Sequence, residues 1–432
     1  MTLHPANSTS WQPPPNFQQV PSSLDGITVF APLPSKPQEE KPASYKCPQC
    51  GADTRFDVAA GGVACEHCGY VAPIKTQTVG VQAERFEFTL ESLNQTAKGW
   101  GTDRRVLHCD GCGAEIAVEE GDLTAICPFC SSSHVDIRAS AMDLLRPRFL
   151  IPFKIQVNAI REQARLWLGK GWYHPKELSS SAAVDRFRGI YLPFWTFDAA
   201  ILSNWKAEVG YERVERYYDS SDRTWRSRTV IDWRWKNGRI SENIHDVLIS
   251  GSSHISHLIL ERLNPFNLND LVIYSSDFLA GWQAHSYDVN LTDAWEEGKA
   301  LMRETAKQAC YHSINSVHVR NFSMTADFND EAWRYILLPV YLASYQFEGK
   351  VFQMMANGQT GVIAGQKPVE WSKVWMAIAA LMAPGFILGL AGLLFLAVGV
   401  GILLIAAGFV LLIAGGAISI GLYKQAVDSE AA

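Results

Sequence analysis

Residues 374–422 read VWMAIAALMAPGFILGLAGLLFLAVGVGILLIAAGFVLLIAGGAISIGL, and this apolar stretch decides the fold. None of its 49 residues is Asp, Glu, Lys, Arg, His, Asn or Gln. As one helix it would be about 73 Å long at ~1.5 Å per residue, whereas the hydrocarbon core of a bilayer is only ~30 Å thick. The stretch therefore predicts two membrane crossings, joined as a helical hairpin.

The closely spaced glycines of Val398-Gly-Val-Gly401 favour a tight turn, which leaves spans of about 374–396 and 402–422. Lys373 precedes the first span and Lys424 follows the second. A two-span hairpin places both lysines on one face, and the positive-inside bias assigns that face to the cytoplasm. A buried hairpin in a soluble protein is the alternative, but an unbroken apolar run of this length argues against it.

Within the hairpin, Gly385 and Gly389 have a small-xxx-small spacing that lets two helices approach closely. The hairpin contains no ionisable side chain, so nothing in it indicates a proton relay or an ion path. Its predicted role is anchoring.

The rest of the chain is expected to be cytoplasmic. No charged segment followed by an apolar core opens the sequence, so we expect no secretory signal. A reducing compartment favours metal binding over disulfides for the nine cysteines. The net charge of −6 gives no general attraction to nucleic acid. Residues 1–44 contain nine prolines and read as a disordered tail.

Eight of the cysteines form two quartets with the same spacing, C-x2-C-x14-C-x2-C. The second quartet repeats the first 62 residues later. Four thiolates from two such turns make a closed tetrahedral Zn²⁺ site, and a glycine after the turn supplies the positive φ that it needs. The expected ligands are Cys47, Cys50, Cys65 and Cys68 in one site, and Cys109, Cys112, Cys127 and Cys130 in the other.

Each quartet predicts a zinc ribbon that needs its metal to fold, one over residues 45–75 and one, with a linker, over 76–139. A strand is expected at 114–118. Complete thiolate quartets leave no open position, so the two Zn²⁺ ions are expected to be structural, and His67 and His108 are not ligands. Iron in a rubredoxin-like site stays open. From Ser44 to Ser140 there are 8 Lys/Arg and 13 Asp/Glu, which disfavours phosphate binding.

Residues 140–373 read as a duplicated α+β region, divided at 140–285 and 286–373. The segment 153–157 leads into a helix at 158–168, and the segment 287–291 leads into a helix at 292–310 with Thr292 as N-cap. Each helix is followed by an aromatic-rich strand with a Leu-Pro pair, where proline favours an edge or a strand start. Further strands are expected at 228–235, 246–249, 317–324 and 350–355. Asn237-Gly238 and Asn357-Gly358 are turn signals.

This region offers little chemistry. His254-x2-His257 lacks a nearby carboxylate or cysteine in the sequence, so an exposed pair at a helix start is the expectation. Cys310 lies on a predicted apolar helix face and is expected to be a buried thiol. Eleven of the fourteen tryptophans fall between Ser140 and Lys373 and are expected in the core. No phosphate-binding loop or catalytic motif is found.

The chain resembles a bacterial family of membrane-anchored zinc-ribbon proteins, usually labelled TFIIB-type zinc-ribbon proteins. The resemblance covers most of residues 45–425. It rests on the Cys-x2-Cys-Gly turns and on Trp100-Gly101, Gly189-Ile-Tyr-Leu-Pro-Phe-Trp-Thr-Phe-Asp198, Leu338-Pro-Val-Tyr341, Asn357-Gly-Gln-Thr-Gly361 and Gly365-Gln-Lys-Pro368. Relatives often carry names borrowed from the primosomal helicase (primosomal protein N′, replication factor Y), but this sequence has no motor motifs. Similar proteins are encoded beside phage-shock protein A or SPFH (flotillin-like) proteins, which implies a role at stressed or specialised membrane.

The expected architecture is thus multidomain: two tandem zinc ribbons, a duplicated α+β region with an antiparallel sheet, a transmembrane hairpin at 374–422 and a cytosolic tail at 423–432. The favoured function is a non-enzymatic scaffold in the bacterial inner membrane, with both termini cytoplasmic, that recruits a phage-shock protein A-like or SPFH-like partner. A membrane-tethered nucleic-acid-binding protein is the alternative. An enzyme is a third hypothesis, for which no nucleophile, base and orienting group can be named.

Overall fold

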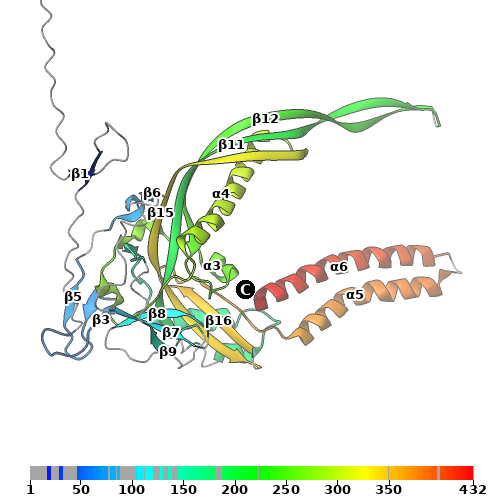
Figure 1. Ribbon diagram of the computed structural model, residues 1–432. Helices are drawn as coiled ribbons and strands as arrows, with labels where there is room; N and C mark the ends of the chain where they lie inside the picture. The colour runs from blue at the N-terminus through cyan, green and yellow to red at the C-terminus, as the bar shows by residue number, and fades with distance from the viewer. Residues whose placement is uncertain are drawn as a thin grey trace, which may run out of the picture. The chain divides into compact units, whose positions relative to one another are not determined.

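The computed structural model describes residues 17–20, 29–32, 46–75, 78–83, 85–87, 104–110, 112–119, 127–129, 135–138, 145–180, 184, 187–221, 223–348, 350–396 and 399–431 (Figure 1). The chain divides into two compact units, Met1–Ala43 and Ser44–Ala432. In the first unit, β1 (Phe17–Val20) and β2 (Val29–Pro32) form an antiparallel pair inside the segment expected to be a tail. The rest of that expected tail lies outside the described residues.

The second unit is built on four long strands: β11 (Arg188–Asp219), β12 (Thr224–Ser250), β15 (Val319–Phe347) and β16 (Lys350–Asn357). Neighbours in the order β12-β11-β15-β16 pair antiparallel, and β16 continues to β17 (Ile363–Gly365). The antiparallel sheet expected for residues 140–373 is therefore present. Its length was not expected, since β11 and β12 extend beyond β15 as a two-stranded ribbon (Figure 1).

Short strands add to both sides of this framework. β10 (Phe149–Leu150) pairs parallel with β15 and antiparallel with β13 (Val272–Ile273). β14 (Gln283–His285) pairs parallel with β11 and antiparallel with β8. The remaining strands are β6 (Phe86–Glu87), β7 (Arg104–Cys109), β8 (Glu115–Glu119), β9 (Val135–Arg138), and the separate sheet of β3 (Arg55–Asp57), β4 (Gly62–Ala64) and β5 (Val71–Pro73).

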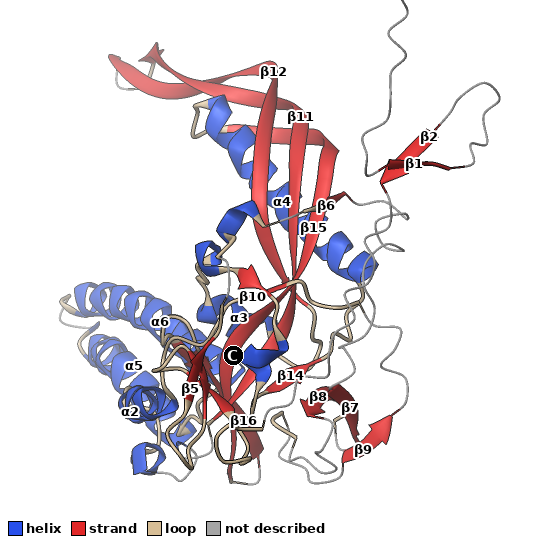
Figure 2. Ribbon diagram, turned by 90° about the vertical axis from the view of Figure 1, so that its left-hand side faces the viewer, coloured by secondary structure: helices blue, strands red, loops and turns tan. Residues whose placement is uncertain are grey.

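In the part of the chain that the structure describes, three α-helices cover the sheet: α2 (Val157–Leu168), α3 (His257–Leu263) and α4 (Leu291–Ile314). α4 runs along β11 and β12 (Figure 2) and buries Trp295, Met302 and Cys310 against them. The expected burial of Cys310 is confirmed. The expected N-cap at Thr292 is wrong, because Asn290 caps α4 through its Oδ1, which accepts a hydrogen bond from Asp293 N at 2.9 Å.

The two Leu-Pro pairs lie opposite each other in the middle of the sheet. Leu192 of β11 is in register with Leu338 of β15. Pro193 and Pro339 therefore lie inside long strands, not at the expected edges or strand starts. Each proline lies in the gap between successive partner strands on one side, β14 and β12 for Pro193, and β10 and β16 for Pro339. A missing N–H is tolerated there because no ladder hydrogen bond is lost.

The same backbone hydrogen bonds recur around both prolines, all between 2.9 and 3.1 Å. They are Gly251 N to Pro193 O, Asp288 N and Val289 N to Gly251 O, Gly358 N to Pro339 O, and Lys154 N and Ile155 N to Gly358 O. The segment before α4 thus bonds to the loop after β12, and the segment before α2 bonds to the loop after β16. The two halves of the region are interlocked by equivalent contacts.

One turn was predicted wrongly. Asn237-Gly238 lies within β12, and this hairpin reverses between Asp219 and Thr224. Asp219 Oδ1 accepts a hydrogen bond there from Ser221 N at 3.0 Å. A Cβ on Gly238 would lie 2.8 Å from ring atoms of Trp205. Glycine is required at this position because the indole covers it, and no turn is involved. The turn at Asn357-Gly358 is confirmed.

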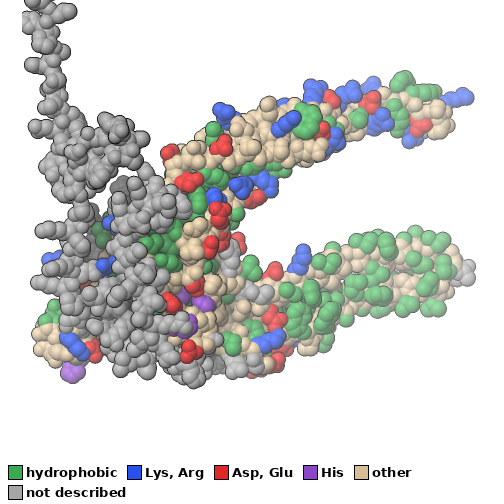
Figure 3. Space-filling view, in the orientation of Figure 1, with side chains coloured by type: hydrophobic (Ala, Val, Ile, Leu, Met, Phe, Trp, Pro, Cys, Tyr) green, Lys and Arg blue, Asp and Glu red, His purple; other side chains and the backbone are tan. Residues whose placement is uncertain are grey.

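The C-terminal apolar stretch forms two helices, α5 (Trp371–Leu394) and α6 (Gly401–Ala431), each long and apolar enough to cross a membrane. Their surface is almost wholly hydrophobic (Figure 3), and Leu394 is 82% exposed. Such exposure fits association with lipid and disfavours a soluble core hairpin. α6 continues through residues 423–431 of the expected tail.

Glycines set the contact between α5 and α6. A Cβ on Gly385, Gly392, Gly401, Gly408 or Gly415 would lie 2.4 to 2.8 Å from atoms of the partner helix or the connecting turn. A Cβ on Gly389 would meet nothing within 4 Å, although its backbone N lies 2.8 Å from the Cβ position of Gly408. The predicted small-residue contact is present, and it extends along both helices with a spacing of seven residues.

Candidate metal centres

The first cysteine quartet is assembled as predicted. The four sulfur atoms of Cys47, Cys50, Cys65 and Cys68 lie within 4.8 Å of one another. Cys47 Sγ is 3.4 Å from Cys68 Sγ, and Cys50 Sγ is 3.6 Å from Cys65 Sγ. Sulfurs around a tetrahedral Zn²⁺ with Zn–S bonds of ~2.3 Å are about 3.8 Å apart, so the cluster has the size that Zn²⁺ requires.

The turns that present these sulfurs share one geometry. Gly51, Gly69 and Gly113 have φ of 74°, 73° and 79°, and each donates its N–H to the carbonyl of the cysteine four residues before it, at 2.7 to 3.0 Å. A residue with a Cβ is strained at such φ values. The predicted role of the glycine after each Cys-x2-Cys pair is thus confirmed for these three turns.

The thiols of the first cluster influence one another. Burial raises the pKa of Cys47, but N–H groups of Cys50 and Gln49 stabilise its thiolate and lower the pKa to about 7. The N–H of Tyr70 favours the thiolate of Cys68, yet the neighbouring Cys47 raises the pKa of Cys68 to about 12. Crowded thiolates repel each other, and a bound cation is what allows all four to be deprotonated.

In the second quartet, Cys109, Cys112 and Cys127 come together, with Cys112 Sγ 3.6 Å from Cys127 Sγ. Cys130 lies outside the described residues. The cluster is mostly buried, whereas Cys50 and Cys68 of the first cluster are exposed. The described residues thus include two cysteine clusters that can hold metal ions, and zinc is consistent with both.

The second cluster is built into the large sheet. β8, which follows Cys112, pairs with β14. The carbonyl oxygen of Phe129, two residues after Cys127, accepts hydrogen bonds from Ser344 Oγ at 2.8 Å and Gln353 Nε2 at 3.2 Å. These donors belong to β15 and β16. Because β7, β8 and β9 join the same sheet, the second cluster shares the core of the α+β region.

The expectation for His254 is corrected. Its Nε2 lies 3.0 Å from Asp288 Oδ2, and His285 adjoins the same carboxylate. Sequence reasoning missed this group because Asp288 is 34 residues away. The backbone hydrogen bonds around Gly251, and Ser253 N donating to Asp288 Oδ1 at 2.7 Å, bring it to His254. His67 is exposed beside its cluster, as expected.

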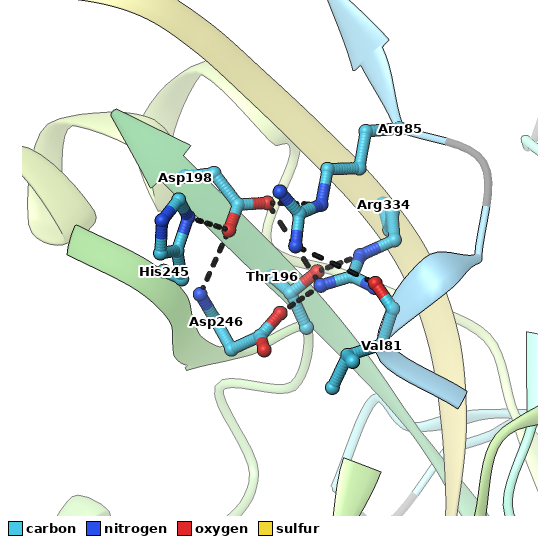
Figure 4. A network of polar contacts seen from close by, with 7 residues as sticks. All are labelled: Val81, Arg85, Thr196, Asp198, His245, Asp246 and Arg334. Atoms are coloured by element: carbon cyan, nitrogen blue, oxygen red, sulfur yellow. Dashed lines mark hydrogen bonds and ion pairs between the residues drawn. The ribbon is translucent and has the colours of Figure 1, made fainter. Parts of the chain in front are cut away.

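A buried ion-pair network lies at the base of the β11–β12 ribbon (Figure 4). Arg334 is fully buried; it pairs with Asp246, lies 3.8 Å from Asp198 and donates from Nε to Thr196 Oγ1 at 3.0 Å. Burial lowers the pKa of Arg334, and the Asp198 carboxylate opposes that shift. A β-bulge in β12, where His245 and Asp246 lie opposite Asp198, places Asp246 in this network.

Arg85 joins the network from the segment between the two cysteine clusters. Its Nε lies 3.2 Å from Asp198 Oδ2, and its Nη2 donates to Val81 O at 3.5 Å (Figure 4). Asp198 Oδ1 also accepts a hydrogen bond from Asp246 N at 3.0 Å. The carboxylates face arginines and a backbone donor, so the network joins β11, β12 and β15 at this point.

A basic cavity lies where α5 and α6 meet the sheet unit, which is the part of the second unit that precedes α5. It encloses about 650 Å³, and its lining includes Lys170, Arg262, Lys367 and Lys424, with Asp428 as an acidic member. The polar ends of the two helices meet beside it: Trp371 Nε1 donates to Glu430 Oε2 at 3.0 Å, and Lys367 N donates to Ser429 O at 2.7 Å. The hairpin therefore begins and ends at one place on the sheet unit.

Comparison with known proteins gives one informative likeness and no family. The chain is 25% identical over 341 residues to the Bacillus subtilis (strain 168) protein described as uncharacterized protein YdjG, which spans 77% of this chain and 92% of that protein. No family model and no solved structure matches the chain. The aligned region covers most of both chains, and the description of the relative gives no activity.

Proposed function

We propose that this protein is a non-enzymatic scaffold of the bacterial inner membrane, whose cytosolic sheet unit presents a docking surface to a protein partner. Two structural Zn²⁺ ions, held by tandem zinc ribbons, stabilise that unit. α5 and α6 cross the membrane, and both termini are cytoplasmic. The proposed partner class is a peripheral membrane-stress protein of the phage-shock protein A or SPFH type.

The orientation is supported by charge at the ends of the hairpin. Lys373 follows the start of α5, and Lys424 lies in α6 where its apolar run ends. The basic cavity adds Lys170, Arg262 and Lys367 at the same end. Basic groups beside a membrane span are typical of the cytoplasmic side, where they face anionic headgroups.

The single observation that carries the scaffold proposal is the ribbon formed by β11 and β12. Beyond the end of its pairing with β15 at Val209, this ribbon exposes Trp225, which is 71% exposed, and Tyr218, which packs edge-on against it. Trp235, nearer the body, is 55% exposed. Exposed tryptophan and tyrosine on a rigid element are typical anchors of protein–protein interfaces.

The charges of the ribbon favour a protein partner over nucleic acid. Arg228 pairs with Glu215 at 3.0 Å, and Arg234 pairs with Asp232 at 2.7 Å. Both acidic and basic side chains occur along the ribbon (Figure 3). Binding to a phosphate backbone draws on unneutralised Lys and Arg, because counterion release drives it. Ion pairing of Arg228 and Arg234 weakens that driving force.

The test is affinity capture of the full-length protein from detergent-solubilised membranes, with bound proteins identified by mass spectrometry. The variant Trp225→Ala/Trp235→Ala should lose the partner, whereas Trp172→Ala, an equally exposed tryptophan in the segment after α2 (55%), should keep it. Unchanged capture by the double variant would contradict the proposal. Salt-dependent DNA binding that the same variant abolishes would favour the nucleic-acid alternative.

We also propose that residues 140–373 arose by duplication. The order α2-β11-β12 recurs as α4-β15-β16. Leu192 and Leu338 are in register, and equivalent hydrogen bonds surround Pro193 and Pro339. An antiparallel pair of equivalent residues lies on a two-fold axis, so this pattern supports two copies of one unit that exchanged their strand-helix segments. A double-mutant cycle across Leu192 and Leu338 should show coupling, as for any direct contact across one core.

A further inference from the structure

Two histidines and one carboxylate converge beside the second cysteine cluster. His254 Nε2 lies 3.0 Å from Asp288 Oδ2, and His285 Nε2 lies 3.6 Å from the same oxygen. The three ligand atoms lie within 4.8 Å of one another. They come from three places in the chain: the segment before α3, the end of β14 and the loop before α4.

The tautomer of His285 follows from its surroundings. The side chain is fully buried, and its Nδ1 lies 2.5 Å from the carbonyl oxygen of Glu115. A carbonyl oxygen only accepts, so Nδ1 carries the hydrogen. In the neutral imidazole the lone pair of Nε2 then points toward Asp288. Nε2 has no hydrogen-bond partner among the described residues.

A lone pair and a carboxylate oxygen 3.6 Å apart repel each other unless a positive species lies between them. The species is either a second proton on a fully buried imidazole or a metal cation. A backbone carbonyl bonded to the far nitrogen is the usual way in which a metal-bound histidine is oriented. The separations also fit, because ligands at ~2.0–2.1 Å around a tetrahedral ion are about 3.3 Å apart.

We propose that His254, His285 and Asp288 form a third metal site, for a first-row divalent ion such as Zn²⁺. Two imidazoles and one carboxylate suit Zn²⁺ or Fe²⁺ and leave at least one coordination position for water or another ligand. This site differs from the cysteine clusters, which thiolates close. Asp288 is the most exposed of the three ligands, so the open position faces solvent on its side.

The second cysteine cluster forms one wall of this site. The ring of Phe129 lies against both imidazoles, with centroids 4.9 Å from His285 and 5.8 Å from His254. A Cβ on Gly113 would lie 3.9 Å from His254 Cε1. Glu115, which orients His285, is the first residue of β8. Loss of metal from the cysteine cluster should therefore weaken the third site, whereas the reverse effect should be small.

The experiment is metal titration of the full-length protein in detergent with Co²⁺, followed by mass-spectrometric metal counting after Zn²⁺ loading. Wild type should bind three ions per chain, and the third equivalent of Co²⁺ should add visible d–d absorption without thiolate charge-transfer bands. His254→Ala and Asp288→Asn should each bind two ions and lose only that third component. His67→Ala, an exposed histidine beside Cys68, should bind three.

Two ions in wild type would overturn the site, as would a third ion that both variants retain. If a variant unfolds and loses all its ions, the Co²⁺ titration of the wild type still decides. Thiolate charge-transfer bands that grow with every added equivalent of Co²⁺, including the third, would exclude a histidine–carboxylate site. The outcome is independent of partner capture, so the scaffold proposal and the third site stand or fail separately.

Discussion

Trp195 and Tyr341 make equivalent contacts from neighbouring strands. Trp195 Nε1 donates a hydrogen bond to Val289 O at 3.0 Å, and Tyr341 Oη donates one to Ile155 O at 2.7 Å. Trp195 lies three residues after Leu192, and Tyr341 lies three residues after Leu338. These two leucines are directly opposite each other in the pairing of β11 with β15. Each acceptor belongs to the segment that leads into a helix, α4 or α2. Buried aromatic donors therefore fasten both helices to the sheet.

Replacing Tyr341 by Phe tests this fastening. The ring is retained and only the hydroxyl is lost, which leaves the Ile155 carbonyl without this donor. We expect a loss of about 1–3 kcal/mol in the free energy of unfolding, measured by urea unfolding in detergent and followed by tryptophan fluorescence. Tyr218→Phe, on the exposed ribbon, is the control and should change stability by less than about 0.5 kcal/mol. Equal effects of the two variants would contradict the assignment.

Cys127→Ser should remove the metal of the second cysteine cluster. A neutral hydroxyl is a poor ligand for Zn²⁺, and the remaining thiolates would be left close together without a cation. Mass-spectrometric metal counting should show the loss of that ion, with a lower unfolding temperature. Cys310→Ser, at the buried thiol of α4, should leave the metal content unchanged. Retention of the full metal content by Cys127→Ser would rule out Cys127 as a ligand.

Local sequence patterns were sufficient for the cysteine clusters and the apolar hairpin. The spacing of Cys47 and Cys50, with Gly51 after them, determines a turn by itself, and a long uncharged run determines two helices. Both are properties of neighbours in the chain, which a single sequence records. The helices at 157–168 and 291–314 were found for the same reason, because their apolar positions recur at helical spacing.

Features that depend on distant residues were missed. Gly238 looks like a turn residue, and only the indole of Trp205 across the ribbon explains it. Trp225 and Trp235 were expected in the core, but both are exposed. Trp225 lies beyond the end of β15, and Trp235 lies opposite Glu208, where the pairing of β11 with β15 is about to end. Asp288 was not connected with His254, because the contact depends on hydrogen bonds between the segment before α4 and the loop after β12. Composition and periodicity do not encode such long-range pairings.

Gly408→Leu should separate the two apolar helices. A Cβ on Gly408 would lie 2.8 Å from Gly389 N and 2.9 Å from Gly385 O, both backbone atoms that cannot move aside. Larger side chains therefore force α5 and α6 apart and remove close packing between them. A cysteine pair introduced on facing turns of the helices should crosslink less efficiently in this variant. Gly416→Leu, whose Cβ would meet nothing within 4 Å, should crosslink as wild type does.

Lys367 should make the stability of the protein depend on pH in the alkaline range. The side chain is buried; its Nζ donates to Trp167 O at 2.5 Å and lies 3.9 Å from the centroid of the Trp167 ring. Burial, with a smaller contribution from Lys170, lowers the pKa of Lys367 from 10.5 to about 8. Below pH 8 the ammonium is protonated in both the folded and the unfolded chain, so the cost of burying it is constant.

Between pH 8 and 10.5 the unfolded chain retains this proton while the folded chain has released it. The unfolded state then binds more protons, so the free energy of unfolding rises with pH, by at most about 1.4 kcal/mol per pH unit for one group.

Other groups titrate in this range, and comparison with Lys367→Met removes their contribution. Wild type should therefore gain stability relative to Lys367→Met from pH 8 to pH 10, measured by thermal unfolding in detergent. Lys350→Met, an exposed lysine paired with Glu430, controls for the loss of one positive charge. A difference between wild type and Lys367→Met that stays constant with pH would mean that the hydrogen bond to Trp167 O and the indole ring solvate the ammonium as well as water does.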